Sequence, residues 1–283
     1  MAKTPVVDAH HHFLDPTMRD YYWMGGDDLV SIRKPFGPED LRPLLAQNGV
    51  DLTVIVHAVP TVEETEEFLS IAADTDFVAG VVGWVDLTAP GVGDVLSQLK
   101  DSDNGKWLVG IRHQVHDEED AEWMAREDVI RGIKAVGTAG LAYDLLIKQR
   151  ELPACMLAVD ANPDTRFVVD HIAKPLIAAG GMEPWASRLK ALAKRPNVYC
   201  KLSGMVTEAD WNGWKPDHLK PYTDCVLEWF GEDRVMFGSD WPYCLLAANY
   251  STVKGTLESL LGNPGRDIYA KIFGGNASAF YRL

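Results

Sequence analysis

The feature that most constrains the fold is an alternation, repeated eight times, between short apolar runs and segments that contain helical sequence. The runs are apolar nearly throughout rather than at every second residue, which is typical of strands buried on both faces of a parallel sheet. The predicted strands cover residues 5–13, 51–58, 77–85, 107–114, 141–147, 165–171, 197–203 and 233–240.

Eight such units in a chain of 283 residues favour the α/β class and a single (β/α)8 TIM barrel. The competing architecture is an open doubly wound sheet, which usually carries a glycine-rich phosphate-binding turn. Neither G-x-G-x-x-G nor G-x-x-x-x-G-K-[ST] occurs in the sequence. No linker interrupts the alternation, so we expect one domain over residues 1–283, with its active site at the C-terminal ends of the strands.

The overall charge and the cysteines narrow the class of protein. The formal net charge of −14 argues against a nucleic acid or an anionic membrane as partner. No run of ~18 apolar residues occurs, and the N-terminus lacks the pattern of a signal peptide. We expect a cytoplasmic protein, because its cysteines are widely spaced and have the pattern of reduced, buried thiols, at Cys155, Cys200, Cys225 and Cys244.

Histidines stand at the end of the first predicted strand. In an extended chain His10 and His12 share one face and His11 takes the other. Two imidazoles on one face can bind a metal ion or a developing negative charge. A fragment of a purification tag or a surface cluster is the alternative, although tags usually have six or more histidines and no strand in front.

Other polar residues occupy the ends of the later strands. Any one of them can be a structural group, but the combined set indicates an active site. They are His57, Arg112, His113, Tyr143, Asp144, Asp170, His171, Lys201, Ser203, Ser239 and Asp240.

Four of these side chains suit the chemistry of a metal-activated water. His10, His12 and His171 offer neutral nitrogens and Asp240 an anionic oxygen, a set that fits one Zn²⁺ or Mn²⁺. The ion would lower the pKa of a bound water, and Asp240 would take its proton. Without a metal, Asp240 would act alone as base while the histidines and Arg112 stabilise an oxyanion.

Five motifs together make the chain resemble the amidohydrolase superfamily, and within it the branch of sugar lactonases and 2-pyrone-4,6-dicarboxylate lactonase. They are V-V-D-A-H-H-H-F (6–13), G-I-R-H-Q (110–114), V-V-D-H-I-A-K-P (168–175), C-K-L-S-G-M-V-T-E-A-D-W (200–211) and F-G-S-D-W-P (237–242). The resemblance covers essentially the whole length.

The resemblance implies hydrolysis of a small lactone, such as L-fuconolactone or L-rhamnonolactone, and hence a role in carbohydrate catabolism. It makes His171 and Asp240 the catalytic residues, with Asp240 as the general base, and His10, His12, His171 and Asp240 the metal ligands. The carboxylated lysine that bridges two metals in related enzymes has no counterpart here. We therefore expect one divalent ion, Zn²⁺ ahead of Mn²⁺, with metal-free catalysis as the alternative. A homodimer is left open.

The remaining substrate-binding candidates are ranked by their chemistry. Arg112 comes first because its guanidinium can hold a carboxylate or a carbonyl oxygen. His113, Tyr143 and Lys201 follow as hydrogen-bond donors, with an ion pair or hydrogen bond inside the barrel as the alternative. Arg112 and His113 are adjacent, so only one of them is expected to point inward. Trp241 belongs to a candidate aromatic wall with Trp23, Trp211 and Trp214, whereas His11, His116 and His218 are taken as structural or solvent-facing.

Two other functions compete with lactone hydrolysis. One is the metal-dependent decarboxylase branch of the same superfamily, which generally carries an H-x-G-G-like stretch where this chain has His171-Ile-Ala-Lys-Pro175. The other is a barrel that binds a ligand without catalysis, which the presence of Asp240 argues against.

Overall fold

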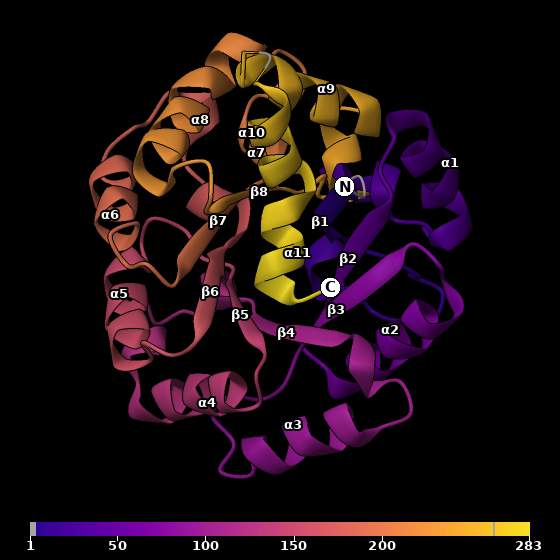
Figure 1. Cartoon of the computed structure of the whole chain (residues 1–283), viewed down its shortest axis with the longest axis vertical. Coiled ribbons are helices and arrows are strands. Elements are labelled where there is room, and N and C mark those ends of the chain that lie inside the picture. The colour runs from indigo at the N-terminus through magenta and orange to yellow at the C-terminus, as the bar shows by residue number, and fades with distance from the viewer. Residues whose placement is uncertain (1–3, 263) are drawn as a thin grey trace.

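The computed structural model describes residues 4–262 and 264–283, and within them eight parallel strands form a barrel in sequential order. Each strand pairs with the next along the chain, so the predicted (β/α)8 TIM barrel is confirmed (Figure 1). The strands are β1 (Val7–His11), β2 (Leu52–Val56), β3 (Val78–Gly83), β4 (Leu108–His113), β5 (Ala142–Leu145), β6 (Arg166–Val169), β7 (Val198–Leu202) and β8 (Val235–Phe237).

Helices surround the barrel as an outer ring (Figure 1). The longer ones are α1 (Pro38–Asn48), α2 (Val62–Asp74), α3 (Val92–Asp101), α4 (Glu127–Thr138), α5 (Leu152–Ala161), α6 (Trp185–Leu192), α8 (Pro216–Phe230) and α9 (Tyr250–Leu260). Shorter helices are α7 (Met205–Glu208), α10 (Arg266–Ala270) and α11 (Asn276–Tyr281), of which α11 lies across one end of the barrel and not in the ring (Figure 1). In the part of the chain that the structure describes, none of these helices is both long and apolar enough to cross a membrane.

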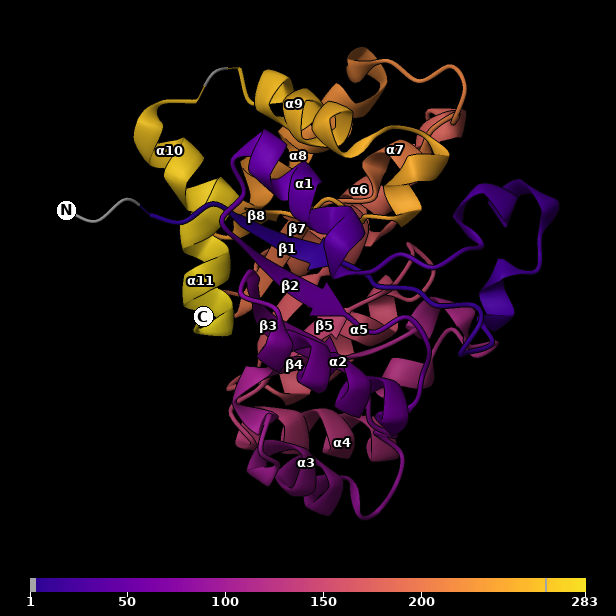
Figure 2. The same cartoon turned by 90° about the vertical axis from the view of Figure 1, so that its right-hand side faces the viewer.

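The segment between β1 and α1 departs from a simple βα unit. It contains two short 3₁₀ turns, Tyr22–Met24 and Asp27–Ile32, and projects from the end of the barrel opposite α11 (Figure 2). Arg19 fastens this segment to α2, because its guanidinium lies 2.9 Å from Glu64 and 2.6 Å from Glu67.

The last and first strands meet around a buried carboxylate. The backbone N–H of Asp240 donates to the carbonyl of His10 at 2.8 Å. Asp8, fully buried on β1, accepts hydrogen bonds from the backbone N–H of Ser239 at 2.8 Å and from the hydroxyl of Tyr250 at 2.9 Å. Asp8 therefore ties β1, the chain after β8 and α9 together, at the point where the barrel closes.

The barrel interior is layered. Its N-terminal end is filled by apolar side chains and covered by α11, which lies across that end (Figures 1 and 2). Above this layer the inward-facing side chains become charged. The apolar layer comprises Val7, Ala9, Val54, Val56, Val82, Val109, Ala142, Val168 and Met236, together with Ala277, Phe280 and Tyr281 of α11.

Replacing Asp8 tests the closure of the barrel. In Asp8→Asn one of the two carboxylate oxygens becomes an N–H₂ group that faces a buried donor, either the Ser239 N–H or the Tyr250 hydroxyl, so we expect the free energy of unfolding to fall by about 2–3 kcal/mol. Urea unfolding followed by circular dichroism measures the change. Asp224→Asn is the control, because Asp224 makes an exposed ion pair with Lys220 and its loss should cost about 0.5 kcal/mol or less. Equal unfolding midpoints for the two variants would contradict this role of Asp8.

Candidate active site

A bulge in β1 determines which face of the strand each of its histidines occupies. The pairing of β1 with β2 shifts by one residue between Asp8 and His11. His10 and His12 point into the barrel end, whereas His11 points outward, where its Nε2 lies 2.9 Å from Thr53 Oγ1. The alternation expected from the sequence therefore holds for the three histidines.

The chain after β6 is held in an uncommon conformation. Four successive residues, 171–174, have φ values of 51°, 48°, 59° and 47° in the left-handed region. Each such residue costs roughly 1–2 kcal/mol, so the segment must be held by its surroundings. The indole N–H of Trp185 donates to the carbonyl of Ile172 at 2.6 Å, and His171 Nδ1 lies 2.9 Å from Ser203 Oγ. Asp240 is also left-handed, with φ 58°.

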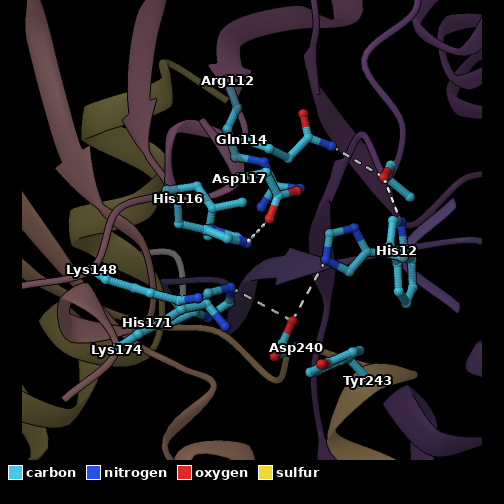
Figure 3. A pocket seen from close by; sticks show the side chains of 13 residues that line it. His12, Arg112, Gln114, His116, Asp117, Lys148, His171, Lys174, Asp240 and Tyr243 are labelled. Atoms are coloured by element: carbon cyan, nitrogen blue, oxygen red, sulfur yellow. Dashed lines mark hydrogen bonds and ion pairs between the residues drawn. The ribbon is translucent and has the colours of Figure 1, made fainter. Parts of the chain in front are cut away.

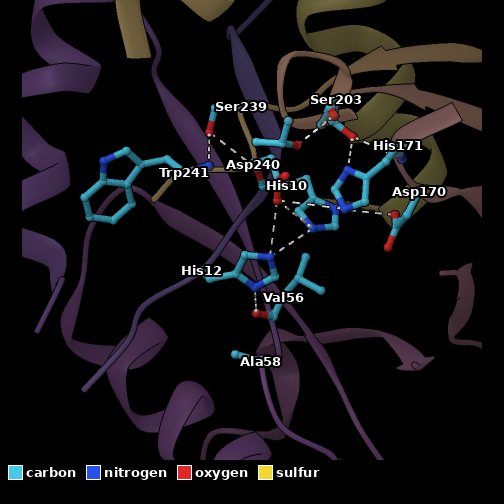
Figure 4. A network of polar contacts seen from close by, with 12 residues as sticks. His10, His12, Val56, Ala58, Asp170, His171, Ser203, Ser239, Asp240 and Trp241 are labelled. Atoms are coloured by element: carbon cyan, nitrogen blue, oxygen red, sulfur yellow. Dashed lines mark hydrogen bonds and ion pairs between the residues drawn. The ribbon is translucent and has the colours of Figure 1, made fainter. Parts of the chain in front are cut away.

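These local conformations bring His10, His12, His171 and Asp240 together (Figure 4). The Nε2 atoms of His10 and His12 are 3.2 Å apart. Asp240 Oδ1 lies 3.8 Å from His10 Nε2, 3.5 Å from His12 Nε2 and 3.8 Å from His171 Nε2. One carboxylate oxygen therefore faces three imidazole nitrogens.

The protonation of these groups suits a cationic ligand. Burial holds the pKa values of His10 and His171 well below the usual range, so both rings are neutral near pH 7. Burial would raise the pKa of Asp240, but His171 and His12 in their protonated forms, together with the Lys174 ammonium, hold that pKa below its usual range, so Asp240 is a carboxylate near pH 7. His12 Nδ1 lies 2.7 Å from the carbonyl oxygen of Val56, which only accepts, so in the neutral ring Nε2 presents its lone pair.

The donor set fits a divalent metal ion. Bonds of about 2.1 Å in a tetrahedral arrangement put ligand atoms roughly 3.4 Å apart. The donor atoms of His10, His12 and Asp240 are separated by 3.2–3.8 Å, and all three residues are buried or nearly so. His171 forms a second such group with His10 and Asp170.

A cavity of about 270 Å³ opens above these groups at the C-terminal end of the barrel (Figure 3). Arg112 lies at its inner end, where its guanidinium contacts Asp170 Oδ2 at 3.2 Å and donates to the carbonyl of His57. The lining residues are His12, Trp23, Ala58, Arg112, Gln114, His116, Asp117, Leu146, Lys148, His171, Lys174, Asp240 and Tyr243.

The other predicted substrate-binding residues do not line this cavity. His113 faces away from it, with Nδ1 2.9 Å from Trp84 Nε1 and Nε2 2.7 Å from Glu118. Tyr143 is fully buried on the outer face of β5, and Trp241 packs edge-on against Phe36. Lys201 points into the barrel beneath His10. Of the adjacent pair on β4, Arg112 is therefore the residue that reaches the cavity.

Several lining residues were not singled out from the sequence. His116, expected from the sequence to be structural or solvent-facing, lines the cavity and lies 3.2 Å from Asp117, which also accepts from the Tyr22 hydroxyl. Lys148 and Lys174 come from the chain after β5 and β6. Lys174 lies in the quoted motif V-V-D-H-I-A-K-P, which is the one signal that pointed to it.

Comparison with known proteins agrees with this architecture. Residues 7–283 match the family model described as Amidohydrolase. The chain belongs to the amidohydrolase family. The predicted family and the predicted hydrolase class are thus confirmed.

Individual relatives of this amidohydrolase are similar over nearly their full length. It is 41% identical to an L-fucono-1,5-lactonase of Burkholderia ambifaria, over 98% of this chain and 95% of the relative. It is 35% identical to an L-fucono-1,5-lactonase of Burkholderia multivorans, over 98% and 96%. A crystal structure of a Burkholderia multivorans amidohydrolase with bound zinc superposes with a TM-score of 0.93 at 33% identity, over 99% of both chains.

The position of His171 depends on a neighbouring glycine. A Cβ on Gly204 would lie 2.5 Å from His171 Nδ1, and Gly204 has φ +62°. We expect Gly204→Ala to displace the imidazole and to lower activity at least tenfold, measured as kcat/KM. Gly49→Ala is the control, because Gly49 has φ +61° and nothing within 4 Å of the added Cβ. Equal losses of stability with unchanged kcat/KM in both variants would contradict this role of Gly204.

Proposed function

We propose that this amidohydrolase opens the ring of a small sugar-acid lactone, with L-fuconolactone and L-rhamnonolactone as the first candidates. The observation that carries the proposal is the carboxylate of Asp240, which faces the Nε2 atoms of three histidines beside a cavity of about 270 Å³. The two lactonases with 41% and 35% identity support the same reaction.

In this proposal His10, His12 and Asp240 hold one divalent ion, with His171 facing the same place. A bound Zn²⁺ or Mn²⁺ supplies positive charge that polarises a carbonyl and lowers the pKa of a water. The zinc in the related structure and the spacing of the donor atoms support this assignment.

Asp240 is proposed as the general base. Its pKa is held below the usual range, so the carboxylate is ready to take a proton from the attacking water. The water oxygen then bonds to the lactone carbonyl carbon. When the bond from that carbon to the ring oxygen breaks, Asp240 returns the proton to the ring oxygen. The products are the carboxylate and the hydroxyl of an open-chain sugar acid, with the carboxyl proton released to solvent.

The cavity wall is proposed to hold the substrate hydroxyls. Lys148 Nζ has no hydrogen-bond or ion-pair partner among residues 4–262 and 264–283, whereas Lys174 Nζ lies 2.8 Å from Glu208. The free ammonium of Lys148 can therefore donate to a substrate oxygen. Trp23 and Tyr243, whose rings contact edge-on at a centroid distance of 5.9 Å, offer an apolar face for the sugar ring.

A lactone panel with a matched base variant tests the reaction. Purified protein loaded with Zn²⁺ or Mn²⁺ is assayed for acid release from aldonolactones and a pyrone dicarboxylate lactone. We expect turnover of at least one sugar-acid lactone, and Asp240→Asn should lower kcat by at least 10³-fold because the proton acceptor is lost. Asp117→Asn, at the edge of the cavity, is the matched carboxylate control and should keep kcat within about fivefold. Turnover of no lactone under either metal condition would overturn the proposal.

The decarboxylase alternative is an outcome of the same experiment. Release of CO₂ from aromatic carboxylic acids, with all lactones untouched, would assign the chain to that reaction instead. In the decarboxylase case Asp240→Asn does not discriminate, so the substrate panel and not the variant decides between the two reactions.

The free cation of the cavity yields a separate prediction. Lys148→Met should raise KM about fivefold with little change in kcat, because one hydrogen bond to a partly exposed cation contributes about 1 kcal/mol. Steady-state kinetics on the preferred lactone measures it. Lys190→Met, which removes an exposed lysine paired with Glu228 outside the cavity, serves as the control. A KM for Lys148→Met equal to that of the control would show that Lys148 does not contact the substrate.

A further inference from the structure

A cluster of buried charges lies beneath the active site. It consists of Arg112, Asp144, Asp170 and Lys201, which point inward from β4 and β5, from the end of β6 and from β7. Asp144, Asp170 and Lys201 do not line the cavity, so contact with substrate does not account for them. We call these four residues the barrel charge cluster.

Lys201 is the centre of this cluster. Its ammonium lies 2.6 Å from Asp144 Oδ2, 3.0 Å from Asp170 Oδ1 and 3.2 Å from His10 Nδ1. The two carboxylates compensate its charge in a region without solvent. The third neighbour belongs to the active site.

His10 Nδ1 therefore lies between two groups with opposite requirements. It is 3.2 Å from the Lys201 ammonium, which only donates, and 3.3 Å from Asp170 Oδ1, a buried acceptor without a hydrogen bond among the described residues. The other ring nitrogen, Nε2, lies 3.4 Å from Arg112 Nη1, which only donates. When Nδ1 carries the proton and faces Asp170, Nε2 presents a lone pair toward His12 and Asp240. When Lys201 donates to Nδ1, the proton moves to Nε2, and that nitrogen can no longer bind a metal ion.

The cluster extends to the opposite end of the barrel through Tyr281. The Tyr281 hydroxyl, on α11, donates to Asp144 Oδ2 at 2.7 Å, the same oxygen that contacts Lys201. The other oxygen, Asp144 Oδ1, is buried and has no hydrogen-bond partner among the described residues. The Tyr281 hydroxyl therefore fixes which carboxylate oxygen of Asp144 faces Lys201.

We propose that Asp170 and Tyr281 are positioning residues that keep the proton of His10 on Nδ1. Asp170 accepts a hydrogen bond from that nitrogen. Tyr281 orients Asp144, so that the Lys201 ammonium remains with the two carboxylates. Metal affinity at the cavity end of the barrel then depends on a hydroxyl group of the helix that covers the other end. The proposal rests on the metal site of the proposed function. It adds two residues outside the donor group of His10 Nε2, His12 and Asp240: Asp170, which faces the other ring nitrogen of His10, and Tyr281, which contacts Asp144.

Zinc affinity of the folded protein tests the proposal. The full chain, with and without each substitution, is titrated with Zn²⁺ in competition with a chromogenic chelator, after circular dichroism has verified folding. Asp170→Asn should weaken Zn²⁺ binding by about 10–100-fold, as measured for comparable partners of metal-binding histidines. Tyr281→Phe should weaken it by a smaller factor, about threefold or more. Tyr222→Phe is the matched control, because this buried tyrosine donates to Gly181 far from the site and should leave the affinity unchanged.

The ring nitrogens of His10 provide a second readout that a purely structural role would not change. In metal-free protein labelled with ¹⁵N, the ring shifts distinguish a proton on Nδ1 from one on Nε2. We expect Nδ1–H in the unsubstituted chain and in Tyr222→Phe, and a population of Nε2–H in Tyr281→Phe.

The outcomes separate this proposal from the proposed function. Unchanged Zn²⁺ affinity in both Asp170→Asn and Tyr281→Phe, or no uptake of Zn²⁺ by the unsubstituted chain, would overturn it even if lactones are hydrolysed. The expected order of affinities would support it even if no lactone is turned over, in which case the proposed reaction alone fails. Loss in Asp170→Asn with unchanged affinity in Tyr281→Phe would overturn the part assigned to Tyr281.

Discussion

The active site depends on the balance of charge inside the barrel. Arg112 and Lys201 face Asp144 and Asp170 within a few ångströms, in a region closed below by an apolar layer and above by His10. A single uncompensated charge in such surroundings costs several kcal/mol, so removing any one of the four charged groups would destabilise the folded protein by leaving a partner unpaired. Burying them in place of apolar side chains gives little net stability. Instead, the barrel charge cluster supplies fixed hydrogen-bonding groups beneath the histidines, which can hold the imidazole rings in one orientation.

The backbone conformation after β6 and β8 also orients the side chains of the site. His171 and Asp240 both occupy left-handed backbone, which no β-strand and no right-handed helix can provide. The strain is held by contacts with rigid parts of the fold: the Trp185 indole beneath Ile172, and the β1 backbone beside Asp240. Side chains aimed in this way converge on one point from three separate strands. A more relaxed turn at either place would send the donor atoms elsewhere.

The sequence predicted the barrel and the convergent residues because both follow from local rules. Apolar runs identify strands, and parallel strands align their C-terminal ends, which collects His10, His12, His171 and Asp240. Alternation alone did not choose between Arg112 and His113. That choice follows from the phase of β4, whose Arg112 pairs in register with the inward-facing Asp144. The cavity residues His116, Lys148 and Lys174 lie on loops, whose paths depend on tertiary contacts that no local pattern encodes.

The distribution of free charge in the cavity bears on how a product would leave it. Ring opening converts a neutral lactone into a carboxylate, which a strongly cationic cavity would retain. Of the three cationic side chains that line it, Arg112 is neutralised by Asp170 and Lys174 by Glu208, which leaves the ammonium of Lys148 at the exposed edge. Asp117 and Asp240 add negative charge nearby. In a chain of net charge −14, and under the proposed function, this arrangement would leave one donor for the substrate while limiting attraction for the anionic product.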